Sequence, residues 1–516
     1  MPVVRFRKTI AAALMAGTAA LSSLSACAGD SADIGAVRSY RAAHEAQIMA
    51  DFRALLSMRN IATNHQDMLT NAAWITDYLG KRGFTSETVS AGGAPYILAE
   101  RKAAGATKTI LIYAHYDGQP VVPKDWISPP YTPSLRDGLV EEGGKAVAWP
   151  KDGHFKPEWR LFARASGDDK APIITLMAAI DALQATKQGI SVNIKLILDG
   201  EEEQGSPSLP GILKKYGDRL STDLMLFCDG PMHQSGRRML VFGARGDMGV
   251  DITTYGALRP LHSGHYGNWA PNPADRLMRL LTAMKNADGH VIVPGYSDSV
   301  IPISPAEEKA VEALPDMGAK LQKELALGSV DGGGERLAAL IMKPAIVVRG
   351  MKSGEIGAKA RNVIPTTATA SLDLRLVPNQ TPESAKTSLT AFFKAQGYFL
   401  TEKDPSPAVL SAHAKVLKVD WKEGAYPAFR SRLDSPSALK LKAILDGING
   451  DQTLMAPTMG GSLPIYLFKD VVKAPIVLLP IANHDDNQHG RNENVRIANL
   501  WNAIDTYAAV LASFGR

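Results

Sequence analysis

A short apolar run that ends in three consecutive glutamates is the feature that most constrains the fold of this chain. Residues 192–198 carry Val, Ile and Leu side chains, as is typical of a buried β-strand. Asp199-Gly200 follows, and then Glu201, Glu202 and Glu203. Like charges held this close raise each other's pKa and repel. The pattern therefore indicates either a bound cation with a carboxylate that acts as a base, or a solvated turn that carries a surface charge run.

Polar residues also follow other predicted strands. An apolar run over residues 109–114 ends at His115, and another over residues 224–228 ends at Asp229. Asp168 precedes a predicted helix over residues 171–185. Each residue alone has a plainer interpretation: a satisfied polar side chain for His115, a helix N-cap for Asp168 and a turn for Asp229. Their occurrence together indicates a ligand site, because open α/β sheets bind ligands at the carboxyl ends of their strands.

Alternating strands and helices predict an α/β fold, with a catalytic domain built on a mostly parallel central sheet flanked by helices. From about residue 240 the pattern changes to that of an inserted α+β domain. We assign to it strands over 239–242, 249–255, 346–348 and 368–376 and helices over 274–284 and 306–327. The expected division is a tether over 28–40, a catalytic domain formed by two segments, 41–240 and 381–516, and the insert over 241–380 between them, with a hinge at 378–382.

The candidate metal ligands are His115, Asp168, Glu203, Asp229 and a histidine late in the chain. Five nitrogen and oxygen ligands suit a pair of Zn²⁺ ions with one carboxylate bridging them. Hydrolases that hold two metal ions a few ångströms apart use them to stabilise both sides of a displacement. The strand ends therefore indicate a hydrolytic metal centre.

A series of short motifs then supports a family assignment. They are His115-Tyr-Asp117, Ser166-Gly-Asp168-Asp-Lys170, Glu202-Glu203-Gln-Gly205-Ser206, Asp229, Leu261-His262-Ser263-Gly264, Arg375-Leu-Val-Pro-Asn379, Gly460-Gly-Ser462 and His489-Gly-Arg-Asn-Glu493. In this order they resemble the co-catalytic zinc metallopeptidase family of carnosinases, glutamate carboxypeptidases, aminoacylases, acetylornithine deacetylase and succinyl-diaminopimelate desuccinylase. The resemblance covers nearly everything after about residue 45.

The resemblance implies a role for each matching residue. His115 and Asp229 would bind one zinc ion, Glu203 and His489 would bind the other, and Asp168 would bridge them. Glu202, directly before the metal-binding glutamate, would be the general base, and Asp117 would orient His115. Glu201, Asp169 and His484 would lie outside the site. Two Zn²⁺ ions per subunit are expected, although Co²⁺ or Mn²⁺ could use the same ligands.

The resemblance also implies how substrate is bound. Arg375, Ser462 and Asn362 match substrate-binding positions, and an arginine fork suits a free carboxylate. The histidine that matches His262 stabilises the oxyanion from a partner subunit in the family, so the insert would be a lid and dimerisation domain of a homodimer. A plainer interpretation of His262-Ser263-Gly264 is a turn that leads into a helix.

The expected function is zinc-dependent hydrolysis of a peptide bond in dipeptides or at the C-terminal residue of short peptides. Tyr426-Pro427 stands where the carnosinase branch has His-Pro, which leaves dipeptide specificity open. An N-acyl-amino-acid deacylase of the same family is the alternative. A non-catalytic, exported substrate-binding lipoprotein is a remote alternative that would predict loss of the catalytic residues, all of which this chain retains.

The N-terminal residues are typical of an export signal. Arg5, Arg7 and Lys8 precede an apolar stretch over residues 10–21, and Leu24-Ser-Ala-Cys27 resembles a bacterial lipobox. Cleavage near Ala26-Cys27-Ala28 without lipidation is the alternative. We expect residues 1–27 to be a lipoprotein signal peptide and the protein to face the periplasm or cell envelope, with a lipid on Cys27 as its one membrane attachment.

Composition excludes other classes of function. The chain has 516 residues and a net charge of +5, with no basic stripe interleaved with aromatic residues and no Cys/His finger spacing. Nucleic-acid binding is therefore not expected. Only Cys228 remains after Cys27, so no intrachain disulfide is expected either.

Replacing the lipobox cysteine tests the export assignment. We expect Cys27→Ser to release the protein from the membrane fraction or to leave it unprocessed, because serine cannot carry the thioether-linked lipid. Membrane fractionation and mass spectrometry of the mature N-terminus measure this. A wild-type protein that is fully soluble, with a cleaved and unmodified N-terminus, would show that the site is an ordinary cleavage site.

Overall fold

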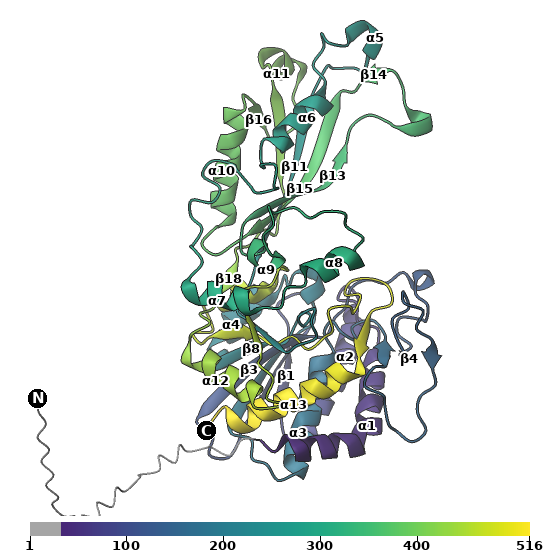
Figure 1. Cartoon of the computed structure of the whole chain (residues 1–516), viewed down its shortest axis with the longest axis vertical. Helices are drawn as coiled ribbons and strands as arrows, with labels where there is room; N and C mark the ends of the chain where they lie inside the picture. The colour runs from purple at the N-terminus through teal and green to yellow at the C-terminus, as the bar shows by residue number, and fades with distance from the viewer. Residues whose placement is uncertain (1–31) are drawn as a thin grey trace, which may run out of the picture.

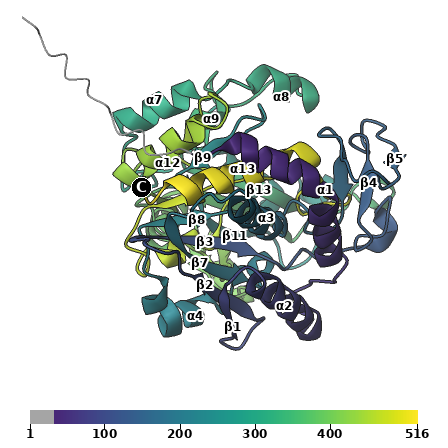
Figure 2. The same cartoon turned by 90° about the horizontal axis from the view of Figure 1, so that it is seen from below.

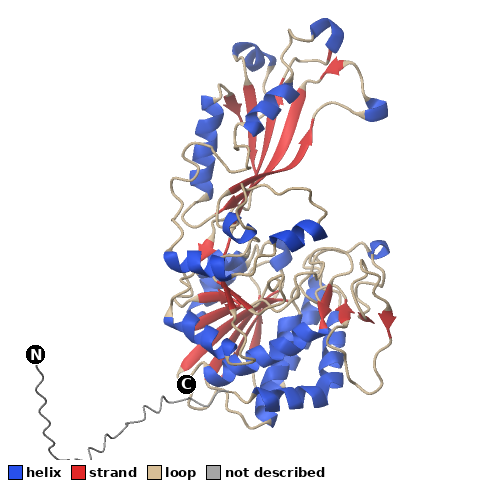
Figure 3. Cartoon of the chain, in the orientation of Figure 1, coloured by secondary structure: helices blue, strands red, loops and turns tan. Residues whose placement is uncertain are grey.

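The computed structural model describes residues 32–516, so the expected signal peptide and Cys27 lie outside the described residues. The chain forms a larger domain, which holds both ends of the described chain, and a smaller domain that projects from it (Figure 1). Both contain helices packed on β-sheet (Figure 3). Of the described helices, none combines the length and apolar character that a membrane crossing requires.

The larger domain is built on an eight-stranded, mostly parallel sheet, as the sequence predicts. In spatial order its strands are β1 (Thr85–Val89), β2 (Tyr96–Arg101), β7 (Val192–Asp199), β3 (Lys108–His115), β8 (Leu224–Phe227), β20 (Ile476–Leu478), β9 (Met239–Val241) and β19 (Leu454–Ala456). Strand β3 lies at the centre and runs parallel to both β7 and β8. Strands β1 and β2 add an antiparallel edge.

Both faces of this sheet are buried, because side chains alternate along each strand. Ile110 and Ile112 of β3 pack into one apolar core, whereas Leu111 and Tyr113 pack into the other. The first core is covered by α1 (Ile34–Leu56), α2 (His65–Gly80), α3 (Ala171–Ala185), α12 (Pro436–Asp446) and α13 (Ile497–Ser513). The second is covered by α4 (Leu209–Tyr216), η3 (Gly217–Leu220) and η5 (Pro464–Phe468). Figure 2 shows α13 and α4 on opposite sides of the strands.

A small antiparallel sheet lies beside the larger one. Its order is β21 (Asn494–Arg496), β6 (Arg160–Phe162), β4 (Ser134–Arg136) and β5 (Ala146–Val147), and η1 (Pro123–Asp125) precedes it in the chain. Pairing of β6 with β21 joins a segment early in the chain to one near its end. This pairing brings the loop between β6 and α3 close to the loop that precedes β21.

The smaller domain is a five-stranded sheet with helices on one face, which we call the lid. Its strands, in spatial order, are β13 (Ala345–Lys352), β15 (Thr367–Leu376), β11 (Gly246–Tyr255), β17 (Val416–Trp421) and β16 (Phe399–Thr401). Helices α6 (Pro273–Thr282) and α10 (Pro382–Ala395) bury Leu280 and Leu389 against Val250 and Ile252 of β11. The far end carries β12 (Leu261–His262), α5 (Ser263–Tyr266), η4 (Gly357–Lys359), β14 (Val363–Ile364) and α11 (Pro407–Ala412) (Figure 1).

The lid does not end at residue 380, so the expected boundary is wrong. Helix α10 and strands β16 and β17 belong to it, and β17 pairs with β11. After β17 the chain returns to the larger domain at β18 (Phe429–Arg430), which pairs with β10 (Gly243–Ala244). The Pro-rich segment at 378–382 is the entry to α10, where Thr381 is the N-cap and Pro382 the first helical residue.

Residues 305–340 also differ from the expectation. The single helix expected over 306–327 is divided into α7 (Pro305–Ala313) and α8 (Gly318–Glu324) around Pro315, and α9 (Leu337–Leu340) follows. Although they lie between lid strands in the sequence, they pack on the larger domain: Leu314 joins its second core, and Glu307 pairs with Arg430 at 2.7 Å. The strand over 239–242, also assigned to the insert, is β9 of the main sheet.

The expected tether over residues 28–40 is wrong in its second half. Helix α1 begins at Ile34, where the side chain of Asp33 accepts a hydrogen bond from the Ala36 N–H and caps the helix. Val37 is fully buried in the first core. The folded domain therefore starts before residue 41.

Candidate metal centre and active site

Three neighbouring strands carry candidate site residues to one edge of the main sheet. His115 is the last residue of β3, Asp229 follows β8, and Glu202 and Glu203 lie on η2 (Glu202–Gln204) after β7. Because β7 and β8 both pair in parallel with β3, their carboxyl ends coincide. Asp168 comes from the loop between β6 and α3, and His489 from the loop between β20 and β21. The five sequence-predicted ligands therefore converge.

These side chains form two groups that could each hold a metal ion. The first consists of His115, Glu202 and Asp229, and the second of Asp168, Glu203 and His489; within each group the ligand atoms lie within 4.8 Å of one another. The sequence assigned Glu202 to proton transfer, and the structure places its carboxylate close to the two other members of the first group.

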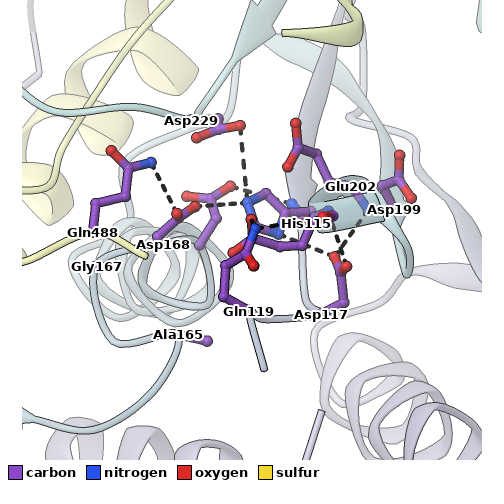
Figure 4. Close-up of polar contacts among 12 residues, drawn as sticks. His115, Asp117, Gln119, Ala165, Gly167, Asp168, Asp199, Glu202, Asp229 and Gln488 are labelled. Atoms are coloured by element: carbon purple, nitrogen blue, oxygen red, sulfur yellow. Dashed lines mark hydrogen bonds and ion pairs between the residues drawn. The ribbon is translucent and has the colours of Figure 1, made fainter. Parts of the chain in front are cut away.

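Asp168 contacts both groups. Its Oδ1 lies 2.8 Å from Nε2 of His115 (Figure 4). Its Oδ2 lies 3.1 Å from Nε2 of His489. Nε2 of His489 also lies 3.1 Å from Oε2 of Glu203. Gln488 donates to Oδ2 of Asp168 at 2.8 Å. One carboxylate thus spans the space between the two groups, as a bridging ligand would.

The charges at the site fit cations. Burial raises the pKa of Asp229 to about 7 and the pKa of Glu202 well above its ordinary value. Hydrogen bonds to Asp168 and Glu203 raise the pKa of His489 to about 11. Oδ2 of Asp229 is buried and accepts no hydrogen bond from any residue that the structure describes. Buried carboxylates such as Asp229 and Glu202, whose pKa burial raises, are stabilised by a positive charge placed beside them, and a divalent ion supplies such a charge.

Asp117 holds the first group in place. Its carboxylate lies 3.2 Å from Nδ1 of His115, on the side of the ring opposite Asp168. It also accepts the backbone N–H groups of Glu202 at 3.1 Å and of Glu203 at 3.0 Å. Such a contact fixes the ring orientation and leaves Nε2 to face a metal ion.

Sequence comparison identifies the family of this centre. The sequence profile of the peptidase family M20/M25/M40 matches residues 111–513. The chain belongs to this family. It is therefore a hydrolase of the metallopeptidase class, and the matched range contains every candidate site residue named above.

Named relatives of this M20 peptidase are dipeptidases. The human β-Ala-His dipeptidase is 26% identical over 421 residues, which cover 80% of this chain and 75% of the relative. The Cys-Gly metallodipeptidase of Saccharomyces cerevisiae is 25% identical over 427 residues, which cover 81% of this chain and 81% of the relative.

Solved structures of the family share its fold. Human carnosine dipeptidase 1 superposes with a TM-score of 0.71 at 21% identity, over 94% of this chain and 99% of that one. An M20 family metallo-carboxypeptidase from Sulfolobus solfataricus gives a TM-score of 0.72 at 22% identity, over 91% of this chain and 99% of that one. The domain arrangement of the M20 peptidase is thus that of known members.

Two predicted substrate-binding residues lie together at the junction of the domains. Arg375 of lid strand β15 donates from Nη1 to Oγ of Ser462 at 2.9 Å and from Nε to Asp373 at 2.8 Å. The other two predicted lid residues lie elsewhere. His262 and Asn362 are exposed at the far end of the lid, where the Ser263 N–H donates to the Asn362 carbonyl. The elements that adjoin them, α5 and β14, lie at the end of the lid that points away from the larger domain (Figure 1).

Glu493 has a structural position that sequence reasoning did not identify. Its fully buried carboxylate accepts the backbone N–H groups of Ala165, Gly167 and Asp168, at 2.9, 3.0 and 3.0 Å. Nη1 of Arg164 donates to it at 2.7 Å. It therefore fixes the loop that carries Asp168 from a position only four residues after His489. The sequence does contain Glu493 as the last residue of the His489 motif. Its hydrogen-bond donors are more than 300 residues earlier in the chain, so the motif alone does not indicate its role.

We predict that Glu493→Gln weakens metal retention in the group of Asp168, Glu203 and His489. The amide has one acceptor oxygen, so it cannot accept all of these donors, and the loop loses its anchor. Loss of such a supporting contact lowers metal affinity by roughly 10–100-fold. Metal content after dialysis against a weak chelator measures the effect.

Glu201→Gln is the matched control for this prediction. Glu201 is also buried and accepts backbone N–H groups, but from Ala94 at 2.9 Å and Ser208 at 2.6 Å, away from Asp168. Equal metal loss in both variants, or full retention in Glu493→Gln, would contradict the role assigned to Glu493.

Proposed function

We propose that this M20 peptidase hydrolyses the peptide bond of dipeptides, or of the C-terminal residue of short peptides, with two Zn²⁺ ions, one bound by residues of each group. The observation that carries the proposal is the contact of Asp168 with both groups, beside Glu202. His115 and Asp229 would hold one ion, Glu203 and His489 the other, and Asp168 both. Co²⁺ or Mn²⁺ could occupy the same nitrogen and oxygen ligands.

Bound in this way, the two ions would lower the pKa of a water molecule toward neutrality and polarise the substrate carbonyl. Glu202 would accept the proton of the attacking water and donate it to the departing amine. Burial raises the pKa of Glu202, whereas the positive charge of His115 lowers it. The proton affinity of Glu202 therefore depends on the charge placed beside it. Asp117 would hold the Glu202 backbone and the His115 ring in fixed positions relative to each other during this transfer.

Arg375 and Ser462 would bind the free carboxylate of the substrate. They already contact each other, and the Arg375 side chain is 30% exposed, so its guanidinium can add a charged partner. An N-acyl-amino-acid deacylase would use the same groups and is the second candidate, whereas a non-catalytic binding lipoprotein would not turn over any amide.

A substrate screen tests the proposed function. Metal-loaded protein that lacks residues 1–27 would be given dipeptides, tripeptides, N-acetyl amino acids and N-succinyl amino acids. We expect hydrolysis of peptides that have a free C-terminal carboxylate. Turnover of the N-acyl amino acids alone would favour the deacylase, and zinc binding without any turnover would favour the binding protein.

The two adjacent glutamates should respond differently to substitution. We predict that Glu202→Gln keeps both zinc ions while kcat falls by at least roughly 10²–10⁴-fold, because the general base is lost. Glu203→Gln should lose zinc as well, since an amide is a weaker ligand than a carboxylate. Zinc analysis and kcat measurement on the same samples check both. Equal zinc loss in the two variants, or loss only in Glu202→Gln, would mean that the roles are reversed.

We also propose that the protein is a homodimer in which His262 acts on the metal centre of the partner subunit. Nδ1 of His262 accepts the Gly264 N–H at 3.1 Å, so the other ring nitrogen, Nε2, carries the hydrogen and is the donor on this exposed side chain. A donor that meets the oxyanion only when substrate is enclosed stabilises the transition state more than the ground state. Asn362, beside it, would contact the same substrate.

Complementation tests this arrangement. His262→Ala and Glu202→Gln should each be nearly inactive alone. After subunit exchange a mixed dimer has one site with both side chains, so activity should recover to about a quarter of wild type at random pairing. Absence of recovery despite demonstrated exchange, or a strictly monomeric protein, would contradict action from the partner subunit.

We propose, finally, that the protein is exported to the bacterial periplasm or cell envelope and held there by a lipid on Cys27. The Arg5 to Cys27 sequence pattern supports this location.

A further inference from the structure

The two ligand groups are held by different kinds of structure. In the first group, His115 is the last residue of β3 and Asp229 follows the neighbouring strand β8 by two residues, so strands set both positions. In the second group, Glu203 lies on the three-residue turn η2, and His489 lies in the loop between β20 and β21. Strands do not place these two side chains, so other contacts have to fix them.

Two glutamine side chains, both labelled in Figure 4, supply such contacts. Nε2 of Gln119 donates to Oε2 of Glu203 at 2.8 Å, and Nε2 of Gln488 donates to Oδ2 of Asp168 at 2.8 Å. The same two oxygens each lie 3.1 Å from Nε2 of His489. Each carboxylate of the second group therefore has an amide donor on the oxygen that contacts His489.

The first group is supported differently. No side chain of residues 32–516 donates a hydrogen bond to the buried Oδ2 of Asp229. Nδ1 of His115 lies 3.2 Å from Asp117, which offers a carboxylate and not an amide. The amide donors are therefore a feature of the second group.

An amide N–H suits a carboxylate that also binds a metal ion. A carboxylate oxygen has two lone pairs, so one can accept the amide hydrogen while the other remains for the ion. The amide is neutral, whereas a lysine ammonium in the same place would repel a cation. Hydrogen bonds of this kind hold a ligand in its binding orientation, and their loss typically costs roughly 10–100-fold in metal affinity.

Gln119 connects the second group to the central strand of the main sheet. It lies four residues after His115, in the loop that also carries Asp117. Asp117 accepts the backbone N–H of Glu203 at 3.0 Å, and Gln119 donates to the carboxylate of the same residue. The loop after β3 therefore holds Glu203 by its backbone and by its side chain.

Gln488 connects the loop of His489 to Asp168. Asn487 and His489, on either side of Gln488, have φ of +58° and +61°, so this loop departs from regular structure. The backbone N–H of Gln488 donates to Asp486 at 3.0 Å, whereas its side chain donates to Asp168. The loop is thus tied to the bridging carboxylate by the residue directly before His489.

We propose that Gln119 and Gln488 are positioning residues that set the metal affinity of the second group, formed by Asp168, Glu203 and His489. The inference rests on the proposed use of two metal ions and deepens it, because it assigns control of one ion to two residues that do not ligate it. Gln488 contacts only Oδ2 of Asp168, whereas Oδ1 contacts the first group. Loss of either amide should therefore weaken one ion and spare the other.

Zinc titration of wild type, Gln119→Met and Gln488→Met tests the proposal. Methionine is unbranched like glutamine but donates no hydrogen bond. Metal-free protein would be titrated with Zn²⁺ against a competing chelator, and Glu203→Gln identifies the binding step of the second group. In both methionine variants we expect this step to lose roughly 10–100-fold in affinity while the other step is unchanged. Equal shifts of both steps, or no shift in either variant, would overturn the proposal.

Gln204→Met is the matched control. Gln204 directly follows Glu203 and its side chain is exposed, so both zinc steps should remain as in wild type. Circular dichroism of the metal-free proteins checks that each variant folds.

Added zinc distinguishes a positioning role from a part in the reaction. The kcat of Gln119→Met should return toward that of wild type at zinc concentrations that fill both sites, because the ligands themselves are intact. A kcat that stays low when both sites are filled would overturn the positioning role of Gln119.

Zinc binding and turnover also separate this inference from the proposed function. Selective weakening of one zinc step, in a protein whose wild type hydrolyses no peptide, would refute peptide hydrolysis and support the role of the two amides. Peptide hydrolysis by wild type, with both zinc steps unaffected in the methionine variants, would support the function and overturn that role.

Discussion

The carboxylate of Asp168 is the interaction on which the rest of this site depends. Its two oxygens contact His115 and His489, which come from opposite ends of the catalytic sequence. A loop that has to place a carboxylate between two ligand groups cannot rely on local structure alone. It is fixed instead by Glu493, whose carboxylate accepts three backbone N–H groups of that loop. The pairing of β6 with β21 brings Glu493 there, so the small sheet contributes to the site's support.

Much of the site could be predicted from the sequence because its residues follow strands with clear apolar patterns. His115, Asp229 and the glutamates of η2 each come directly after a buried strand, and parallel pairing brings their ends together. Glu493 could not be predicted in the same way. Its role depends on contacts with residues more than 300 positions earlier, and a buried glutamate has the same local pattern as a solvated one.

The domain boundaries were harder to predict than the elements. Strand β17 has the alternating pattern of a half-buried strand, but only its pairing with β11 shows that it belongs to the lid. Helix α7 lies between lid elements in sequence, yet it packs on β19 of the larger domain. Local patterns determine which residues form a helix, whereas the partner of each apolar face is set by packing between remote segments. The elements were also missed here in part, because β17 was not among the predicted strands and the helix predicted over 306–327 is divided into α7 and α8.

The three consecutive glutamates show how one short turn can give identical residues different chemistry. Glu201 is turned away from the site, where its carboxylate accepts the N–H groups of Ala94 and Ser208. Glu202 and Glu203 both donate their backbone N–H groups to Asp117, which also contacts His115. One carboxylate therefore sets the positions of a proposed metal-binding ring, a proposed base and a proposed ligand. Each of these three groups must be held to within about half an ångström for catalysis. A mobile Asp117 side chain would displace all three at once. This explains why the carboxylate of Asp117 must be buried.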